Sequence, residues 1–159
     1  MIISTQSKAV NETNALGKEL AGVITKGMVI ILNGSLAAGK TTLVQSICNA
    51  LEYSDPVTSP TYTLSNVYET ESIRIVHCDF YRLKSDYEVE GLGLDLYADN
   101  SLIIIEWGGS FKELFDNYLE IDIQMSEAKD NHRIITFDTS NLYDTEKLLV
   151  ESLLLKIKN

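Results

Sequence analysis

One short segment has the residue types and the spacing of a phosphate-binding loop. Residues 34–41 read Gly-Ser-Leu-Ala-Ala-Gly-Lys-Thr and match the pattern G-x-x-x-x-G-K-S/T. Glycines let the backbone wrap closely around a phosphate, so that successive N–H groups point at the anion. The segment therefore predicts binding of a nucleoside triphosphate. The residues expected to hold it are Gly34, Ser35, Leu36, Ala37, Ala38, Gly39, Lys40, Thr41 and Thr42.

Two side chains at the end of the loop would supply the chemistry. Lys40 is expected to reach the outer phosphates, and the Thr41 hydroxyl to hold a magnesium ion. The flanking elements suit that role. Residues 28–32 read as a fully buried strand, and residues 42–51 as a helix whose positive N-terminal end faces the anion. These neighbours disfavour the alternative interpretation, a plain glycine turn between a strand and a helix.

Two carboxylates elsewhere follow buried strands. Residues 73–78 predict one strand with Asp79 at its end, and residues 102–105 predict another with Glu106 at its end. A triphosphatase needs a carboxylate near the magnesium ion, at the end of a strand beside the loop. We expect one of the two to orient magnesium, directly or through its water shell, and the other to position the attacking water.

The residue types around these carboxylates leave several interpretations open. Trp107 is either a packing aromatic or a site residue, and His77 is either a ligand or base or a hydrogen-bonded structural histidine. Arg82 suits a phosphate or a nearby carboxylate, and Tyr81 suits simple packing. The segment 57–62, Val-Thr-Ser-Pro-Thr-Tyr, is either a connector or a mobile switch that carries hydroxyl groups towards the sheet edge.

The remaining pattern predicts one nucleotide-binding domain over residues 1–159. Further strands are expected at 1–4, 62–68, 119–125 and 133–137, and helices at 8–24, 110–115 and 142–157. Residues 85–97 predict short helical pieces. Ser7 would cap helix 8–24, where Val10 is one of the apolar positions, and Leu148, Leu149, Leu153 and Ile157 would face inward on the last helix. The strands at 119–125 and 133–137, joined by a turn at 126–131, would form an antiparallel edge hairpin. The fold class expected is α/β: a P-loop NTPase-like three-layer sandwich with a mostly parallel central sheet and antiparallel edge strands.

Composition narrows the classes of partner and compartment. The net charge is −10, with three arginines and no cluster of basic residues, so direct binding of DNA or RNA is disfavoured. Two cysteines without metal-ligand spacing suggest reduced thiols in the cytoplasm rather than a zinc site or disulfides. No apolar stretch approaches the 18 or so residues that a membrane span needs.

Five ordered motifs resemble those of the bacterial TsaE (YjeE) family. They are the loop at 34–42, the S-P-T-F/Y switch at 58–62, the H-x-D-x-Y-R-L box at 77–83, the L-G-L segment at 91–94 and the E-W signature at 105–107. Together they run from residue 34 to residue 107, and a set of five is far more specific than a phosphate loop alone. The chain departs from the family loop G-x-L-G-A-G-K-T-T at position 37, where alanine tolerates a positive φ poorly. That departure puts nucleotide affinity or rate in question.

The resemblance implies an ATPase that uses ATP and Mg²⁺ in tRNA threonylcarbamoyladenosine biosynthesis. It implies two partners, a sugar-kinase-like catalytic subunit that modifies adenosine 37 and its paralogous dimerisation subunit, which would carry most of the tRNA contact. By position, the resemblance implies that Lys40 contacts the β- and γ-phosphates and that Thr41 and Glu106 hold magnesium. It also implies that Asp79 acts in the second switch, that Trp107 matters for activity, and that Thr61 senses the γ-phosphate. The switch residues carried over are Ser59, Pro60, Thr61, His77, Tyr81 and Arg82. The adenine pocket is not visible in the motifs, although Arg133 is one candidate for stacking.

Three other functions fit a phosphate loop in a chain of this size. A small-molecule kinase normally carries an arginine-bearing lid, and three scattered arginines argue against one. A GTPase would need an N-K-x-D motif, which the sequence lacks. A regulatory module that binds nucleotide without turnover stays open, since hydrolysis by the isolated chain is expected to be slow.

Overall fold

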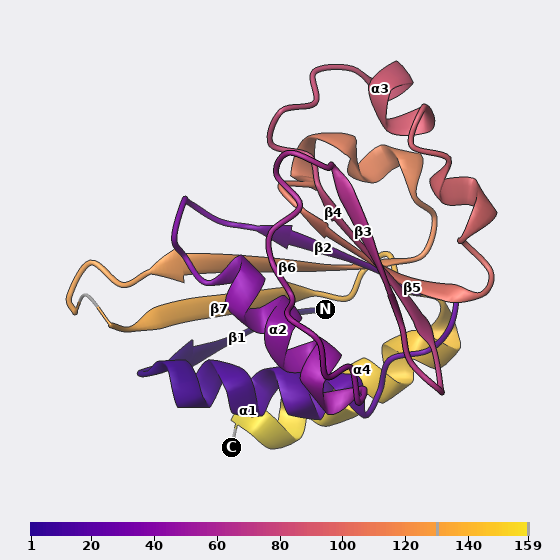
Figure 1. Ribbon diagram of the computed structural model, residues 1–159. Coiled ribbons are helices and arrows are strands. Elements are labelled where there is room, and N and C mark those ends of the chain that lie inside the picture. The colour runs from indigo at the N-terminus through magenta and orange to yellow at the C-terminus, as the bar shows by residue number, and fades with distance from the viewer. Residues whose placement is uncertain (130, 159) are drawn as a thin grey trace.

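The computed structural model describes residues 1–129 and 131–158 and contains one seven-stranded sheet in the order β1-β7-β6-β2-β5-β4-β3 (Figure 1). The strands are β1 (Ile2–Ser7), β2 (Val29–Asn33), β3 (Ser65–Glu69), β4 (Arg74–Asp79), β5 (Ser101–Glu106), β6 (Tyr118–Met125) and β7 (Arg133–Asp138). The helices are α1 (Val10–Ala21), α2 (Lys40–Ala50), α3 (Asp86–Glu90) and α4 (Asp144–Lys158), with 3-10 turns η1 (Leu94–Leu96) and η2 (Gly109–Leu114).

The centre of the sheet is parallel and its margins are antiparallel, which confirms the expected fold class. Strand β2 pairs in parallel with β5 and β6, and β5 pairs in parallel with β4. The edge strands β1 and β3 run antiparallel to β7 and β4. The predicted edge position of the hairpin is wrong, because β6 lies inside the sheet and β1 covers β7. Alternating burial shows that one face is covered, but it does not fix where a strand lies in the sheet.

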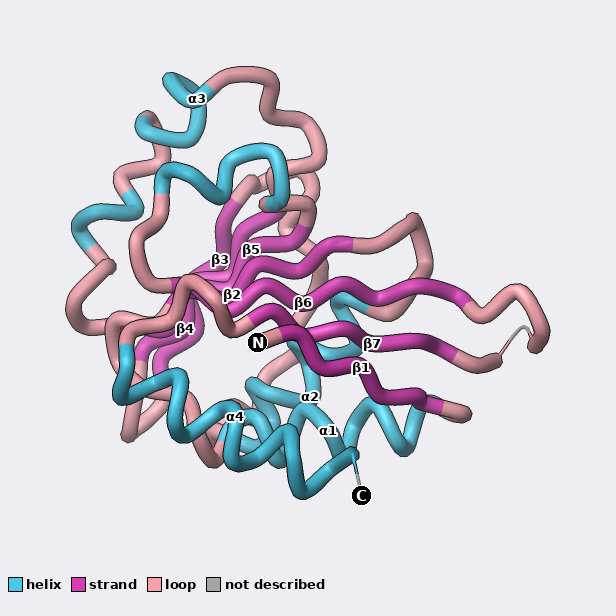
Figure 2. Tube along the Cα trace, turned by 180° about the vertical axis from the view of Figure 1, so that it is seen from behind, coloured by secondary structure: helices cyan, strands magenta, loops and turns pink. Residues whose placement is uncertain are grey.

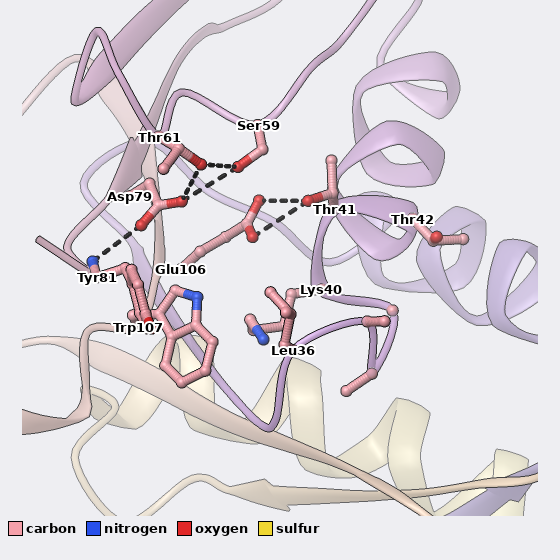
Figure 3. A pocket seen from close by; sticks show the side chains of 13 residues that line it. Leu36, Lys40, Thr41, Thr42, Ser59, Thr61, Asp79, Tyr81, Glu106 and Trp107 are labelled. Carbon is pink, nitrogen blue, oxygen red and sulfur yellow. Dashed lines mark hydrogen bonds between the residues drawn. The ribbon is translucent and has the colours of Figure 1, made fainter.

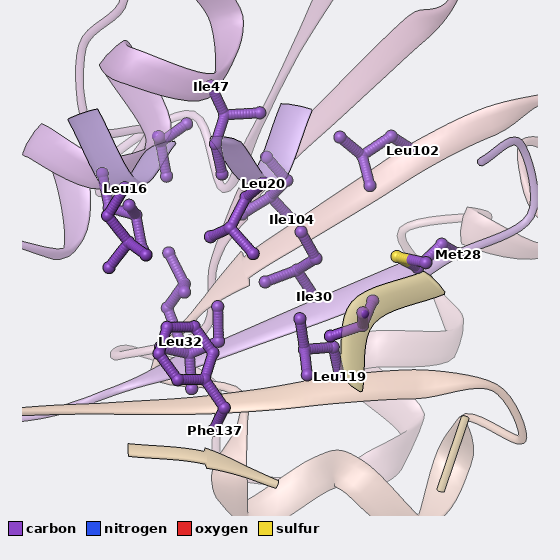
Figure 4. Close-up of a cluster of buried hydrophobic side chains, with 14 of the residues drawn as sticks. Leu16, Leu20, Met28, Ile30, Leu32, Ile47, Leu102, Ile104, Leu119 and Phe137 are labelled. Atoms are coloured by element: carbon purple, nitrogen blue, oxygen red, sulfur yellow. The ribbon is translucent and has the colours of Figure 1, made fainter. Parts of the chain in front are cut away.

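Helices cover both faces of the sheet. Figure 2 shows α1, α2 and α4 together on one face, with α3 on the other. The larger core lies under α1, α2 and α4. It includes Leu20, Ile30, Ile47, Ile104 and Phe137, all at most 1% exposed (Figure 4). A smaller core on the second face packs strand residues against α3, η1 and η2. The continuous apolar strands β2 and β5 are therefore buried on both sides, as a parallel sheet requires.

Two helix predictions are wrong in detail. Ser7 is not the cap of α1: it ends β1 and donates its hydroxyl to the Ala9 carbonyl, and Ala9 takes the cap position without a side-chain hydrogen bond. Val10 is correspondingly 66% exposed. On α4 the buried residues are Val150 and Leu154.

The leucine-rich sequence of α4 explains the second error. Leu148 and Leu149 are 69% and 42% exposed, whereas Leu153 and Ile157 pack partly against the core as expected. Two overlapping apolar stripes run along this helix, and packing selects one of them. A hydrogen bond from Thr139 to Glu151 helps fix the rotation of the helix.

The predicted strand at 62–68 begins later than expected. Residues 61–63 form a turn, closed by a 2.7 Å hydrogen bond from the Leu64 amide to the Pro60 carbonyl, and β3 starts at Ser65. In the predicted turn 126–131, residue 130 lies outside the described residues. Across residues 1–129 and 131–158, no helix has the length and apolar character to cross a membrane.

Candidate functional site

The loop at 34–41 connects the end of β2 to the start of α2, as predicted. Gly34 has φ +136°, and a Cβ there would lie 2.2 Å from the Ile123 carbonyl oxygen, so only glycine fits. Gly39 takes φ +114° directly before α2. The backbone geometry therefore explains both fixed glycines of the motif.

Ala37 occupies the left-handed region at the top of this loop, with φ +61°. An L-residue pays about 1–2 kcal/mol for that conformation because its Cβ approaches the carbonyl oxygen. The expectation that alanine is strained at this position therefore has a structural basis.

A pocket of about 400 Å³ opens beside the loop at the carboxyl ends of β2, β4 and β5 (Figure 3). Its lining residues are Leu36, Ala37, Ala38, Gly39, Lys40, Thr41, Thr42, Ser59, Thr61, Asp79, Tyr81, Glu106 and Trp107. Segments far apart in sequence meet here because the central strands are parallel and end at the same edge. The fold thus brings together the loop, the hydroxyls of the 57–62 segment and both predicted carboxylates.

Thr41 and Glu106 are in direct contact at the floor of this pocket. The Thr41 hydroxyl lies 2.9 Å from Glu106 Oε1 and 3.1 Å from Oε2. Glu106 is 3% exposed and pairs in register with Asp79 on the neighbouring strand. The hydroxyl and carboxylate oxygens are hard ligands of the kind that Mg²⁺ prefers, so this pair suits the ion.

The oxygen-bearing side chains beside the loop are few, as is usual at magnesium sites. Among residues 1–129 and 131–158, no three His, Cys, Asp or Glu side chains gather as a metal site. Mg²⁺ is commonly bound by one or two protein oxygens together with water and substrate phosphates. Two oxygen-bearing side chains beside a phosphate loop meet that requirement.

Behind Glu106 lies a buried chain of hydrogen bonds. His77 Nε2 is 2.8 Å from Glu106 Oε1, and His77 Nδ1 is 3.0 Å from the Tyr68 hydroxyl. The same hydroxyl is 3.4 Å from the Thr58 carbonyl oxygen. His77 does not line the pocket, and its two ring nitrogens are used within the protein. These contacts agree with the hydrogen-bonded structural histidine, one of the two interpretations that the residue types left open.

Asp79 connects the hydroxyl-bearing segment to the sheet. Its Oδ2 accepts hydrogen bonds from Ser59 (3.1 Å) and Thr61 (3.0 Å), and its Oδ1 accepts one from the Tyr81 amide (2.9 Å). The 57–62 segment and the strand end at Asp79 are thus joined at one carboxylate, 20 and 18 residues from its hydroxyl donors along the chain.

Lys40 is folded back onto its own loop. Its Nζ donates to the carbonyl oxygens of Gly34 and Ser35, both at 2.8 Å, and lies 4.0 Å from the centre of the Trp107 ring. Burial lowers the pKa of Lys40, although the nearby carboxylates of Glu106, Asp79 and Asp122 act in the opposite direction. The indole therefore borders the ammonium group that the motif assigns to phosphate, and Trp107 belongs to the site rather than to the core.

Tyr81 packs against Trp107 at the mouth of the pocket, with ring centres 4.9 Å apart and the ring planes tilted by 54°. Trp107 itself has φ +61° and donates its amide to the Leu32 carbonyl at 2.8 Å. Tyr81 is 63% exposed, and its contact with Trp107 agrees with the packing interpretation. Together the two rings form an aromatic wall opposite the loop.

Several predicted site residues do not line the pocket. They are Gly34, Ser35, Pro60, His77 and Arg82. Arg82 lies instead over the exposed ring of Tyr62, at 5.6 Å. Arg133, the stacking candidate, donates its Nε to the Ala38 carbonyl at 2.8 Å and so contacts the loop itself.

Sequence reasoning missed two supporting residues. Tyr68 was assigned only to a strand, yet its hydroxyl is hydrogen-bonded to His77. Asn66 pairs with His77 across the antiparallel strands, and Tyr68, two residues after Asn66, lies on the same face of β3. Asn33 ends β2, accepts a hydrogen bond from the Gly109 amide at 3.0 Å and donates to Glu120 at 2.8 Å. An amide side chain directly before the loop glycine was the available signal.

Comparisons with known proteins follow the same motifs. The family model described as "Threonylcarbamoyl adenosine biosynthesis protein TsaE" matches residues 7–135. A Streptomyces coelicolor protein named tRNA threonylcarbamoyladenosine biosynthesis protein TsaE is 36% identical over 127 residues, 76% of this chain and 86% of that protein. A Rickettsia felis protein of the same name is 33% identical over 134 residues, 82% of this chain and 76% of that one.

A solved structure shares the fold over nearly its whole length. The crystal structure of Bacillus subtilis YdiB superimposes with a TM-score of 0.78 at 26% sequence identity, covering 98% of this chain and 96% of that one. The similarity therefore includes the outer strands and α4, beyond the stretch matched by the family model.

Proposed function

The chain belongs to the TsaE family, and on that premise we propose that it is the ATP-binding and ATP-hydrolysing component of tRNA threonylcarbamoyladenosine biosynthesis. It acts through two partner subunits, a catalytic subunit that modifies adenosine 37 and a paralogous dimerisation subunit. The family supports the pathway, and the pocket supports the nucleotide chemistry.

One observation carries the proposal for hydrolysis. Thr41, at the start of α2, is hydrogen-bonded to Glu106, at the end of β5, within the pocket that Lys40 also lines. A phosphate loop alone would support binding, whereas a loop threonine in contact with a strand-end carboxylate supports magnesium-assisted phosphoryl transfer.

The side chains of this chain have separable tasks in that reaction. The loop amides bind the phosphates, and Lys40 leaves its loop carbonyls to contact the β- and γ-oxygens. Asp79 orients the attacking water, and Thr61 moves from Asp79 to the γ-phosphate when nucleotide binds. Trp107 and Tyr81 exclude water from the outer side of the pocket.

Thr41 and Glu106 would hold Mg²⁺, with Tyr68 and His77 fixing the carboxylate from behind. When bound, the ion would neutralise negative charge on the phosphate oxygens. Direct binding of tRNA is not part of the proposal, because the net charge of −10 repels a polyanion.

The test is steady-state ATP hydrolysis by this chain, alone and with the two partner subunits from the same organism. We expect stimulation by the partners, and a loss of about 10²–10³ in kcat for Glu106→Gln and for Lys40→Ala. Glu69→Gln, a change to a surface carboxylate at the far end of β3, is the matched control and should hydrolyse ATP normally.

Two results would contradict the proposal. If the partners do not change the rate of ATP hydrolysis and the chain phosphorylates a metabolite with ATP, the chain is a small-molecule kinase. Tight ATP binding with no turnover in any mixture would make the chain a regulatory binding module.

A further inference from the structure

A second cavity lies at the opposite end of the sheet from the nucleotide pocket. It has a volume of about 730 Å³ and is formed where β2 and β5 begin, between α3, η1 and the start of α4. Volumes of this size are typical of sites that take small molecules or side chains. The phosphate loop does not line it, and of the five motifs only the L-G-L segment at 91–94 reaches it, through Leu94.

The floor of the cavity is apolar. Val29, Ile103 and Val89 line it, and each is at most 7% exposed. Two large side chains on its border, Leu114 and Tyr143, are 38% and 57% exposed. An apolar floor with exposed apolar side chains beside it is a common feature of surfaces that bind another molecule.

The rim of the cavity is strongly acidic. Glu90, Asp95, Asp99, Asp116 and Glu146 line it, and Lys26 is the single basic residue among its lining. Within the part of the chain that the structure describes, no ion pair involves any of these five carboxylates. Such a rim favours a cationic occupant and repels phosphate, which excludes nucleotides and tRNA from this site.

Asn117 adds a hydrogen-bond donor to the cavity. It lines the cavity and is 9% exposed, and its Oδ1 accepts the Tyr143 amide at 2.8 Å. Its Nδ2 donates to no group in the described residues. Ser101 Oγ is the side-chain atom that is buried without a partner in the described part of the chain, so Asn117 Nδ2 is open to solvent and can donate to an occupant that carries a hydrogen-bond acceptor.

We propose that this cavity docks a basic–apolar peptide segment of another protein, one with a large apolar side chain next to lysine or arginine. The apolar side chain would fill the floor, the cation would face the rim, and a peptide carbonyl would accept from Asn117 Nδ2. A polyamine supplies only the cation, since at neutral pH it has neither an acceptor nor a bulky apolar group. The inference does not depend on ATP hydrolysis, and its failure would leave the proposed function intact.

The test is a titration of the isotope-labelled protein by NMR with a short capped peptide in which phenylalanine lies between lysine and arginine. We expect saturable shifts of the Asn117 side-chain amide and the Ala98 backbone amide, with no shift of the Trp107 indole. The affinity should fall about tenfold in Asp95→Asn/Asp99→Asn, because two exposed charges are lost. Asp55→Asn/Glu71→Gln removes two exposed carboxylates elsewhere and should bind like the parent.

Three results would overturn the proposal. Equal binding of a peptide with glutamates in place of the basic residues would remove the role of charge. Spermidine that shifts the same resonances at least as tightly as the peptide would make this a small-cation site. Shifts that grow with protein concentration alone, without peptide, would show that the face joins copies of this chain.

Discussion

His77 and Glu106 meet inside the protein with Nε2 and Oε1 only 2.8 Å apart, and neither residue is more than 3% exposed. Because Thr41 contacts the other side of the same carboxylate, Glu106 is held from two directions before any nucleotide arrives. A carboxylate fixed in this way loses little freedom on binding a cation, which is the purpose of such supporting contacts.

The hydroxyl of Tyr68 should matter for turnover more than for binding. Tyr68→Phe keeps the ring that packs on Tyr53 but removes the hydroxyl that bonds His77. We expect kcat for ATP to fall about tenfold, the order of magnitude that loss of a supporting contact produces. ATP affinity should stay within about twofold, and the free energy of unfolding should fall by about 1 kcal/mol.

Two measurements separate positioning from general destabilisation. Tyr53→Phe alters the neighbouring ring, whose hydroxyl has no hydrogen bond among the described residues, and should leave kcat unchanged. In a double-mutant cycle, Tyr68→Phe should add no further loss to Glu106→Gln. Additive losses would mean that Tyr68 does not act through Glu106.

Lys40 should report nucleotide binding through Trp107, the single tryptophan of the chain. The ammonium lies 4.0 Å from the indole centre, so phosphate that draws it away changes the environment of the ring. ATP with Mg²⁺ should change the Trp107 emission of the parent protein. In Lys40→Ala the response should vanish at the same concentrations, since a lost charge-assisted contact of about 3 kcal/mol weakens affinity on the order of a hundredfold.

Lys18→Ala, on the exposed face of α1, is the control for loss of a positive charge and should respond as the parent does. An unaltered titration in Lys40→Ala would remove the loop lysine from the binding site.

Ala37→Gly should stabilise the protein. Glycine takes φ +61° without the steric cost that alanine pays, although it gains freedom in the unfolded chain. The net gain expected is about 0.5–1 kcal/mol in the free energy of unfolding, measured by urea denaturation. Ala38→Gly is the matched control: Ala38 is 1% exposed and has no positive φ, so that change should destabilise the protein. Destabilisation by both variants would contradict the assigned strain.

The two thiols should make the protein sensitive to alkali. Burial raises the pKa of Cys48 and of Cys78 to about 12, from an ordinary value near 9. Between those values the folded state binds more protons than the unfolded state, so stability falls as the pH rises. Each thiol contributes a decrease of up to about 1.4 kcal/mol per pH unit in the window above pH 9.

Urea denaturation between pH 8 and pH 11 tests this, with Cys48→Ala/Cys78→Ala as the comparison. The double variant should be less stable at pH 8, because buried atoms are removed, yet lose stability less steeply above pH 9. The comparison is needed because Lys40 acts in the opposite direction: burial lowers its pKa, so its contribution rises with pH in this range. Parallel curves for both proteins would show that the thiols are not the cause.

The sequence predicted the parts of the site that obey local rules. The loop follows from two glycines whose positive φ values other residues rarely adopt, and Asp79 and Glu106 follow from apolar strands that end in a carboxylate. The parallel sheet then brings those ends to one edge. The supporting residues were not predictable in the same way, because the contact of Tyr68 with His77 depends on how β3 pairs with β4.

By itself the sequence determined the phosphate loop, the succession of strands and helices and the two strand-end carboxylates, because each depends on neighbouring residues or on a short period. Only the tertiary structure decided which leucines of α4 are buried, that β6 lies inside the sheet, and that an acidic cavity forms at the far end of β2 and β5. Those features depend on register and on the packing of segments distant in the chain, where several arrangements satisfy the same apolar pattern and the free energy of close packing selects one.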